Sequence, residues 1–228
     1  MTTSNMPEIA SDTPASNAPD AAPAISDVRF WLDPICPWCW VTSQWIRRVA
    51  AARGFEVTWE PISLLVKNET TPESSFYDRV WWTYGLLRVL ESVRASEGNA
   101  TVGELYTEFG RRIHHEQTTM WDPAEALKTI GLDAEHAVAA SAEQWDAELR
   151  RRMAEGLALV GNDVGTPIIA FTTADGREVA TFGPVITKVP SPTDSLKLWD
   201  SFVTLTELDE FWELKRTRTQ HPDFGEAP

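Results

Sequence analysis

The sequence predicts an α/β fold in which an all-helical block divides the strand-forming segments. Strand and helix patterns alternate over residues 28–65, whereas residues 72–161 carry only helical patterns, and strand patterns return after Pro167. The chain has 228 residues, of which 43% are hydrophobic. This length and composition suit one domain with an insertion, or two small domains.

The first predicted unit is a strand, a helix and a second strand. Val28 to Leu32 is a short apolar run typical of a buried strand. The helix should continue from Trp40 to Arg53, with apolar residues at helical spacing and Gly54 as its C-terminal cap. Phe55 to Leu65 is the second strand. Such a strand–helix–strand unit predicts that its two strands are parallel.

Capping residues divide the helical block into segments. Thr101-Val102-Gly103-Glu104 has the pattern of a capping box at a helix start. Asp122-Pro123 begins another helix, which Gly131 ends, and Asp133 can cap a short helix after it. Ser141 should cap a longer helix that ends near Gly161.

The C-terminal part predicts a hairpin and a closing helix. The strands Ile168–Thr172 and Glu178–Phe182 are joined by an Asp175-Gly176 turn. Ser191-Pro192 then opens a helical region that should include Phe211 and Leu214.

The element order is therefore β-α-β, a helical block, and β-β-α. This order predicts a thioredoxin-like fold with an inserted all-helical subdomain. We assign residues 27–71 and 162–220 to the thioredoxin-like domain and residues 72–161 to the helical insertion. Residues 1–26 are rich in Ala, Pro, Ser, Thr, Asn and Asp, so we expect a disordered tail. Residues 221–228 are expected to form a C-terminal tail.

The charge and composition exclude several classes of partner. The formal net charge is −14, whereas nucleic-acid binding and binding to anionic membranes both require a basic surface. No apolar run approaches the roughly 20 residues of a membrane span. Residues 1–26 also lack the basic start and apolar stretch of a secretion signal. We therefore expect a cytoplasmic protein with no nucleic-acid or membrane partner, and its oligomeric state stays open.

Both cysteines of the chain lie in the motif Cys36-Pro37-Trp38-Cys39, at the predicted start of a helix. A redox dithiol needs two sulfurs that can bridge, one of them as the attacking thiolate. At a helix start, unpaired N–H groups and the positive end of the helix dipole stabilise negative charge on the first sulfur. The second sulfur lies one turn further along and can attack a mixed disulfide. Pro37 suits the first helical position, which needs no N–H.

A metal site is the main alternative for this motif. Structural zinc usually has four Cys or His ligands, and the chain has only two cysteines. His114 and His115 are adjacent, and we expect them to point in different directions on a helix. The pattern thus favours a redox pair with no metal.

Pro167 is the second element of the predicted site. In thioredoxin-like proteins, a cis proline at the start of a strand faces the dithiol. Thr166-Pro167 stands directly before the strand Ile168–Thr172 in this chain. We therefore expect the Thr166–Pro167 bond to be cis, although most X-Pro bonds are trans.

The segments Asp33 to Trp40 and Gly165-Thr166-Pro167 resemble the DsbA-like superfamily, which carries a helical domain inside a thioredoxin fold. Phe182 to Ile186, Leu198-Trp199-Asp200 and Glu213 to Arg216 resemble its actinobacterial members described as mycothiol-dependent nitroreductases or reductases. The resemblance extends over roughly Asp27 to Thr219.

The resemblance implies a mechanism and a set of site residues. Cys36 would attack, Cys39 would resolve the mixed disulfide, and mycothiol would return the protein to its reduced form as a thiol co-substrate, with no bound cofactor. The oxidised partner would be a small-molecule or protein disulfide, or a nitro compound. The residues expected to bind substrate or support the site are Pro37, Trp38, Thr166, Pro167, Asn68, Tyr77 and His115.

Two other functions stay open at this point. Kappa-class glutathione transferases and hydroxychromene carboxylate isomerases share this architecture, but they have Ser where Cys36 stands and no second thiol. A non-enzymatic chaperone or zinc-binding scaffold could use the dithiol for structure alone. The intact pair of cysteines favours the oxidoreductase.

Overall fold

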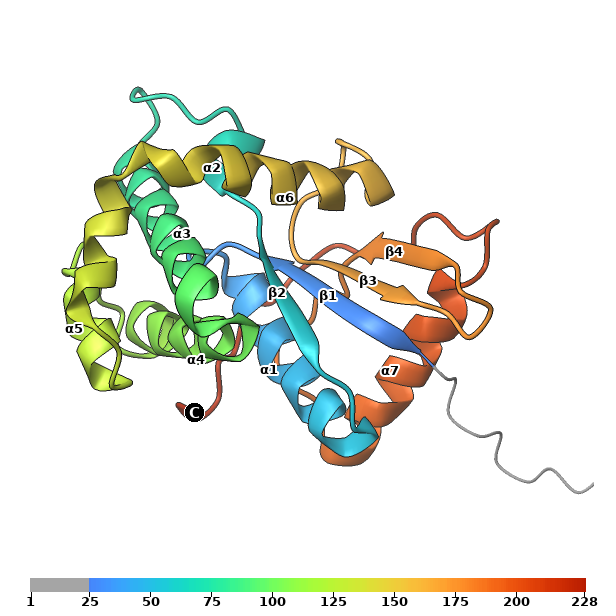
Figure 1. Cartoon of the computed structure of the whole chain (residues 1–228). Helices are drawn as coiled ribbons and strands as arrows, with labels where there is room; N and C mark the ends of the chain where they lie inside the picture. Colours follow the sequence, from blue (N-terminus) through green and yellow to red (C-terminus); the bar gives the residue numbers. More distant parts are fainter. Residues whose placement is uncertain (1–24) are drawn as a thin grey trace, which may run out of the picture.

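The computed structural model describes residues 25–228, so the expected tail at residues 1–26 lies almost wholly outside the described residues. One four-stranded sheet organises the chain, with the strand order β2-β1-β3-β4 (Figure 1). β1 pairs in parallel with β2 and antiparallel with β3, and β3 and β4 form the predicted hairpin. The strands are β1 (Ser26–Leu32), β2 (Val57–Pro61), β3 (Ile168–Thr172) and β4 (Glu178–Phe182).

Helices cover both faces of this sheet. Helices α1 (Pro37–Arg53) and α7 (Pro192–Thr206) pack on one face, and α6 (Asp146–Val160) packs on the other (Figure 1). Side chains alternate along the strands accordingly: Phe30 joins the core on the α1 and α7 face, and its neighbour Trp31 joins Met153 of α6. Because both faces are buried, β3 is apolar from Ile168 to Phe171, and β1 is apolar from Phe30 to Leu32.

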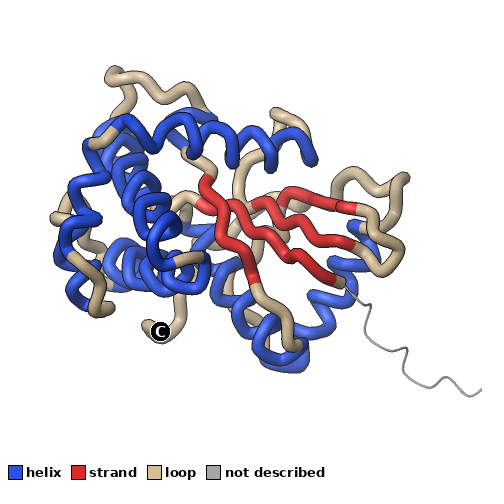
Figure 2. The backbone as a smooth tube through the Cα atoms, in the orientation of Figure 1, coloured by secondary structure: helices blue, strands red, loops and turns tan. Residues whose placement is uncertain are grey.

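The elements between β2 and β3 are all helical, and those that precede α6 gather at one side of the sheet (Figure 2). They are α2 (Leu64–Lys67), α3 (Tyr77–Glu97), α4 (Asn99–Gly110), the π-helical turn η1 (Arg111–His115), α5 (Pro123–Thr129), the two 3₁₀ segments η2 (Ala134–Ser141) and η3 (Glu143–Trp145), and α6. The last of these, α6, packs on the sheet directly before β3 in the sequence. It therefore supplies the helix that a thioredoxin-like fold needs between its β-α-β and β-β-α units.

Tryptophan rings fit into notches left by glycines on the helices. A Cβ atom at Gly110 of α4 would lie 2.1 Å from the Trp40 ring, and one at Gly156 of α6 would lie 2.6 Å from the Trp31 ring. Both distances are far shorter than any van der Waals contact, so only glycine admits these rings. The close approach joins α1 to α4, and β1 to α6.

The capping predictions hold at three helix starts and fail at two. Asp122, Asp133 and Ser191 each accept a backbone N–H at the start of the helix that follows. The predicted capping box at Thr101 is wrong, because α4 already begins at Asn99. The Asn99 side chain accepts the N–H of Trp59 and donates to the carbonyl of Val57, so contacts with β2 fix the start of α4.

The predicted cap at Ser141 is also wrong. Ser141 ends η2, and its hydroxyl donates to the carbonyl of Val138. Helix α6 starts at Asp146, whose carboxylate accepts two hydrogen bonds from the Arg88 guanidinium of α3. A contact between helices therefore decides where α6 begins.

Two predicted elements are longer than the observed ones. The strand expected to reach Leu65 ends at Pro61, because Ser63 accepts the N–H of Val66 and starts α2. The closing helix ends at Thr206 and does not include Phe211 or Leu214. The buried apolar face of this helix consists of Trp199, Phe202 and Val203, and acidic residues follow the helix in the sequence.

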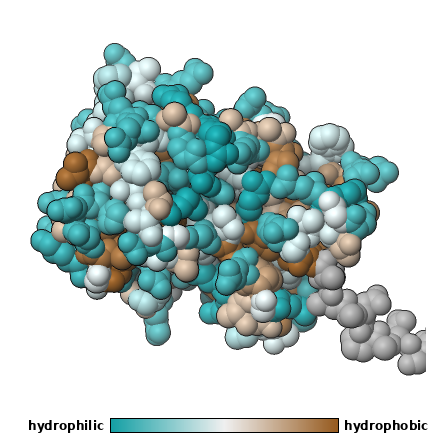
Figure 3. Space-filling view, in the orientation of Figure 1, coloured by the Kyte–Doolittle hydropathy of each residue, from teal (hydrophilic) through white to brown (hydrophobic). Residues whose placement is uncertain are grey.

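The molecular surface is mostly polar on the face shown in Figure 3, and hydrophobic residues lie there in separate groups. No helix of the described residues is long and apolar enough to cross a membrane.

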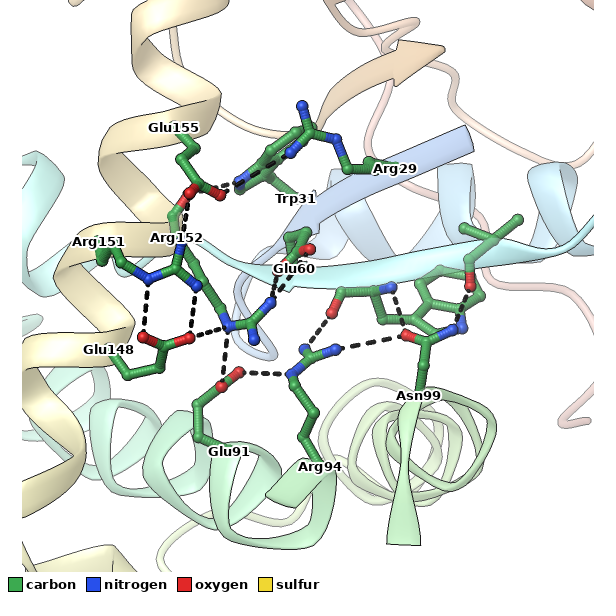
Figure 4. A network of polar contacts seen from close by, with 12 residues as sticks. Arg29, Trp31, Glu60, Glu91, Arg94, Asn99, Glu148, Arg151, Arg152 and Glu155 are labelled. Atoms are coloured by element: carbon green, nitrogen blue, oxygen red, sulfur yellow. Dashed lines mark hydrogen bonds and ion pairs between the residues drawn. The ribbon is translucent and has the colours of Figure 1, made fainter. Parts of the chain in front are cut away.

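A buried ion-pair network fixes α6 to its neighbours (Figure 4). The Arg152 guanidinium lies 3.0 Å from Glu60 of β2, 3.1 Å from Glu91 of α3 and 2.9 Å from Glu148 of its own helix. The side chains of Glu60 and Glu91 are only 5% and 2% exposed. Arg94 pairs with the other oxygen of Glu91, at 3.0 Å. Two buried carboxylates thus depend on two arginines that come from different helices.

We expect Arg152→Met to lower the free energy of unfolding by about 3–5 kcal/mol, because it leaves the buried Glu60 carboxylate without its cation and Glu91 with Arg94 alone. The neighbouring Arg151 is the matched control, because its guanidinium pairs only with partly exposed carboxylates. Arg151→Met should cost under about 1 kcal/mol. Urea unfolding of both variants measures the difference, and equal losses would contradict the role given to Arg152.

Candidate functional site

Cys36 is the N-cap residue of α1. Its sulfur accepts the backbone N–H of Cys39 at 3.4 Å, in the place where a serine or aspartate oxygen caps an ordinary helix. Pro37 occupies the first helical position, as predicted. This arrangement directs an N–H donor and the positive end of the helix dipole at the Cys36 sulfur, and both stabilise negative charge.

The two cysteines differ in their surroundings. Both are free thiols; Cys36 is 4% exposed and Cys39 is fully buried. Burial raises the pKa of Cys39 well above its ordinary value, and the adjacent Cys36 raises it further. Cys39 therefore holds its proton at neutral pH, which is the state expected of a resolving thiol before it reacts.

Thr166 contacts both cysteines. The Cys39 sulfur lies 3.0 Å from the Thr166 hydroxyl oxygen, and Cys36 donates its S–H to the Thr166 carbonyl at 3.8 Å. The Thr166 hydroxyl itself donates to the carbonyl of Trp31 at 3.2 Å. Since its only hydrogen is used there, Thr166 accepts from the Cys39 thiol. The Thr166–Pro167 bond is cis, as predicted.

Asp33 fixes the loop that leads into Cys36. Its carboxylate is fully buried and accepts the N–H of Ile35 at 3.0 Å and that of Leu64 at 2.7 Å. The Asp33 carbonyl also accepts the N–H of Cys36. Burial raises the pKa of Asp33 to about 6, and the two backbone hydrogen bonds partly oppose that rise. One side chain thus joins the β1–α1 loop to the start of α2.

His114 and His115 surround Trp40, the residue after the second cysteine. The Nε2–H of His114 donates to the carbonyl of Pro34 at 2.9 Å, and its ring stacks on Trp40. Trp40 Nε1–H donates to Nε2 of His115 at 3.1 Å. Burial lowers the pKa of His114 to about 4 and also lowers that of His115. Both imidazoles are therefore neutral at pH 7 and act as hydrogen-bond partners.

The expectation that these adjacent histidines point in different directions needs correction. Both rings contact Trp40, one on its face and the other edge-on, with ring centres 5.7 Å away in each case. They belong to η1, where the N–H of Glu116 bonds to the carbonyl of Arg111 five residues earlier. The wider π turn brings successive side chains closer together than an α-helix does.

The remaining predicted residues are placed less centrally. Trp38 is half-buried, and the Arg218 guanidinium lies 5.2 Å from its ring centre. Asn68 is exposed at the end of α2, and its side chain makes no hydrogen bond within residues 25–228. Tyr77, the first residue of α3, stacks on Trp81. The structure therefore joins Cys36, Cys39 and Thr166, and His115 reaches only Trp40, the residue after Cys39. No hydrogen bond or ring contact in the described part of the chain links Asn68 or Tyr77 to the two cysteines or to Thr166.

Three residues of the site were missing from the predicted set. They are Asp33, His114 and Trp40. Asp33 carried a usable signal, because an aspartate side chain commonly accepts the backbone N–H of the residue two positions later and so forms a turn. Trp40 had none, because its role depends on the packing of α4 and η1 against α1, and of the two adjacent histidines only His115 was included in the predicted set.

No cluster of three or more metal-ligating side chains occurs in the part of the chain that the structure describes.

A family model and one relative match most of this chain. The family described as Rv2466c-like, mycothiol-dependent nitroreductase Rv2466c, matches residues 35–216. An uncharacterised protein of Mycobacterium tuberculosis, Rv2286c, is 27% identical over 199 residues, which cover 86% of this chain and 84% of that protein.

Solved structures with the same fold have low sequence identity. A cytosolic disulfide reductase, DsbM from Pseudomonas aeruginosa, is 16% identical with a TM-score of 0.53, over 78% of this chain and 99% of that chain. A 2-hydroxychromene-2-carboxylate isomerase is 14% identical with a TM-score of 0.51, over 78% of this chain and 94% of that chain. These likenesses confirm the predicted fold class, a thioredoxin-like fold with inserted helices.

The match to the family model covers most of the chain and includes both cysteines, Thr166 and Pro167. The chain belongs to the Rv2466c-like family of mycothiol-dependent nitroreductases, and it is an oxidoreductase of the thiol class.

Proposed function

We propose that the protein is a cytoplasmic dithiol oxidoreductase in which Cys36 attacks, Cys39 resolves, and mycothiol restores the reduced pair. The observation that supports it most is the asymmetry of the two sulfurs. Cys36 caps a helix and accepts an N–H hydrogen bond, whereas Cys39 is fully buried against Thr166. One sulfur is placed to attack as a thiolate and the other keeps its proton until it is needed.

Reduction of a disulfide by this pair takes two exchanges. The Cys36 thiolate attacks one sulfur of the substrate, a Cys36–substrate disulfide forms, and the other half leaves as a thiolate. Cys39 then loses its proton and attacks the Cys36 sulfur, so the second half leaves and takes up a proton. The products are a Cys36–Cys39 disulfide and two substrate thiols. Two molecules of mycothiol reverse these steps and leave as mycothiol disulfide.

A nitro compound would take the same two electrons. Oxidation of the dithiol to a disulfide supplies two electrons and two protons, which convert a nitro group to a nitroso group and water. No bound cofactor is needed for either reaction, because the sulfurs carry the electrons.

Thr166 serves the second exchange. While Cys39 is a thiol, Thr166 accepts its S–H and donates to the Trp31 carbonyl. When Cys39 loses the proton, the hydroxyl can rotate and donate to the thiolate instead. A hydroxyl is suited to this change because it is both donor and acceptor. The hydrogen bond is therefore kept through the step in which a negative charge appears in a buried place.

Asp33 and His114 act as positioning residues. Asp33 accepts two backbone N–H groups, and His114 donates to the Pro34 carbonyl, so the loop before Cys36 is fixed from two sides. Trp38 forms one flank of the site. Asn68 and Tyr77 would contact a bound substrate beyond Trp38.

The choice of reductant tests the proposal as a whole. The oxidised protein should be reduced faster by mycothiol than by glutathione or by a thioredoxin and thioredoxin reductase system. Reduction by the thioredoxin system alone would contradict the mycothiol assignment. Isomerase or transferase activity that survives loss of both sulfurs would favour the kinship with carboxylate isomerases.

We expect the two cysteine variants to fail differently. Cys36→Ser should be inactive and form no adduct, because the remaining sulfur is buried and protonated. Cys39→Ser should react once and stay as a mixed disulfide on Cys36. Mass spectrometry after incubation with mycothiol disulfide distinguishes the two. An adduct on Cys39 in the first variant would reverse the assignment.

Thr166→Val should slow the second exchange by about fivefold to tenfold, the effect of one lost hydrogen bond at a step that creates charge. The first exchange, followed by release of the first leaving thiol, should be nearly unchanged. Thr166→Ser keeps the hydroxyl and should restore the rate. Equal slowing of both exchanges would show that Thr166 supports the fold rather than the resolving sulfur.

Asp33→Asn should change how stability depends on pH. The pKa of Asp33 rises from 3.8 to about 6 on folding. The contribution of Asp33 to the free energy of unfolding is therefore fully present below pH 3.8 and is lost as the pH rises through 6. The stability deficit of the variant should therefore shrink by up to about 3 kcal/mol between about pH 4 and pH 7. Urea unfolding at several pH values measures it, and a constant deficit would contradict the raised pKa of the buried Asp33 carboxyl.

A further inference from the structure

The last part of the chain crosses the molecule to reach the dithiol. After α7, Asp209 accepts a hydrogen bond from Arg177 near the β3–β4 turn, at 3.2 Å. The chain then passes behind the sheet in the view of Figure 1 and ends beside α4, far from the end of α7. We refer to residues 215–228 as the C-terminal strap.

The strap is held in place although it has no helix or strand. The N–H of Asp223 donates to the carbonyl of Thr187 at 2.6 Å. Phe224 is half-buried between exposed neighbours, and its ring centre lies 5.1 Å from that of His114 and 5.8 Å from that of His115. Thus the segment predicted as a C-terminal tail packs against the two histidines of the site.

A second contact of the strap lies at the motif itself. The Arg218 guanidinium is 5.2 Å from the ring centre of Trp38, the residue before Cys39. This distance is within the range of a cation–π contact. Since Trp38 flanks the attacking sulfur, Arg218 occupies space along which a large substrate would have to approach.

The two contacts lie at the two ends of the Cys36 segment in the sequence, because His114 bonds to Pro34 before Cys36 and Trp38 follows it. Phe224 covers His114, which holds the Pro34 carbonyl, while Arg218 covers Trp38. Consistent with this, the Cys36 side chain is only 4% exposed. Both residues belong to a segment with no helix or strand; Arg218 is exposed and Phe224 is half-buried.

We propose that the C-terminal strap, through Arg218 and Phe224, is a specificity element that admits small disulfides and nitro compounds to Cys36 and excludes the disulfides of proteins. This inference rests on the proposed function, because it assigns the substrate class of the same site. It also assigns a role to one basic residue of the strap, Arg218.

The direct test measures access to the Cys36 sulfur in the full-length Cys39→Ser protein, which has one thiol. Iodoacetamide serves as the small probe and a maleimide on a long polyethylene glycol as the bulky one. Arg218→Ala combined with Phe224→Ala should speed the bulky probe about tenfold, as expected for the loss of one aromatic and one cation–π contact. The rate with iodoacetamide should change less than twofold.

Gln220→Ala is the matched control, because Gln220 is an exposed strap residue with no side-chain hydrogen bond among residues 25–228. It should leave both rates unchanged. Should Phe224→Ala lower the melting temperature, Arg218→Ala alone carries the test, since Arg218 is exposed and its loss leaves the core intact.

The substrate side of the test uses the two intact cysteines. The double strap variant should reduce insulin disulfides about tenfold faster than the unchanged protein, with hydroxyethyl disulfide reduced at the same rate by both. Equal acceleration with both disulfides, or no gain with the bulky maleimide, would overturn the proposal. Failure of mycothiol to reduce the protein would refute the proposed function instead, and the two alkylation rates would still decide the role of the strap.

Discussion

The packing of Trp40 against Gly110 is the contact on which the site depends. Trp40 follows the second cysteine on α1, and its ring fills the notch at Gly110 at the end of α4. From that position it stacks on His114 and donates to His115. His114 in turn holds the Pro34 carbonyl, two residues before Cys36. A single buried indole thus connects the helices inserted between β2 and β3 to the loop that carries the attacking sulfur.

The same burial separates the two sulfurs chemically. Because α4 and η1 cover α1 at Trp40, Cys39 has no contact with water and its pKa rises. Cys36 lies at the helix start, where it accepts an N–H. Polar groups that are buried here form hydrogen bonds within the protein. Asp33 accepts two backbone N–H groups, and Thr166 forms hydrogen bonds with Cys39 and with the carbonyl of Trp31. A dry environment with satisfied polar groups lets one pair of identical side chains behave as two different thiols.

The sequence predicted the parts of the fold whose signals are local. The strands of the sheet, the hairpin at Asp175-Gly176 and the helix start at Cys36 follow from short apolar runs, a turn dipeptide and a proline at the first helical position. Caps at Asp122, Asp133 and Ser191 were likewise readable, because the capping side chain and its N–H partner lie within three residues.

Most features that escaped prediction depend on contacts between distant segments; the early end of β2, caused by the Ser63 cap of α2, is a local exception. Asn99 starts α4 because β2 lies against it, and Asp146 starts α6 because Arg88 reaches it from α3. Both histidines contact Trp40 because η1 is a π turn, and no residue pattern predicts a π turn. The position of Phe224 depends on the whole path of the chain beyond α7. For the site, local reasoning located the dithiol and Thr166, while the residues that orient them came from the packing of other elements.

The return of the chain end to the site has a practical consequence for handling the protein. Phe224, only four residues before the terminal Pro228, touches the imidazoles beside the dithiol. A purification tag or fluorescent fusion joined at that end would therefore be tethered next to the reactive sulfur. The described chain begins at the far end of β1, a seven-residue strand that separates Ser26 from the Cys36 loop by roughly 20 Å. A label attached near Ser26 would therefore lie away from the reactive face, whereas one attached near Phe224 would lie on it.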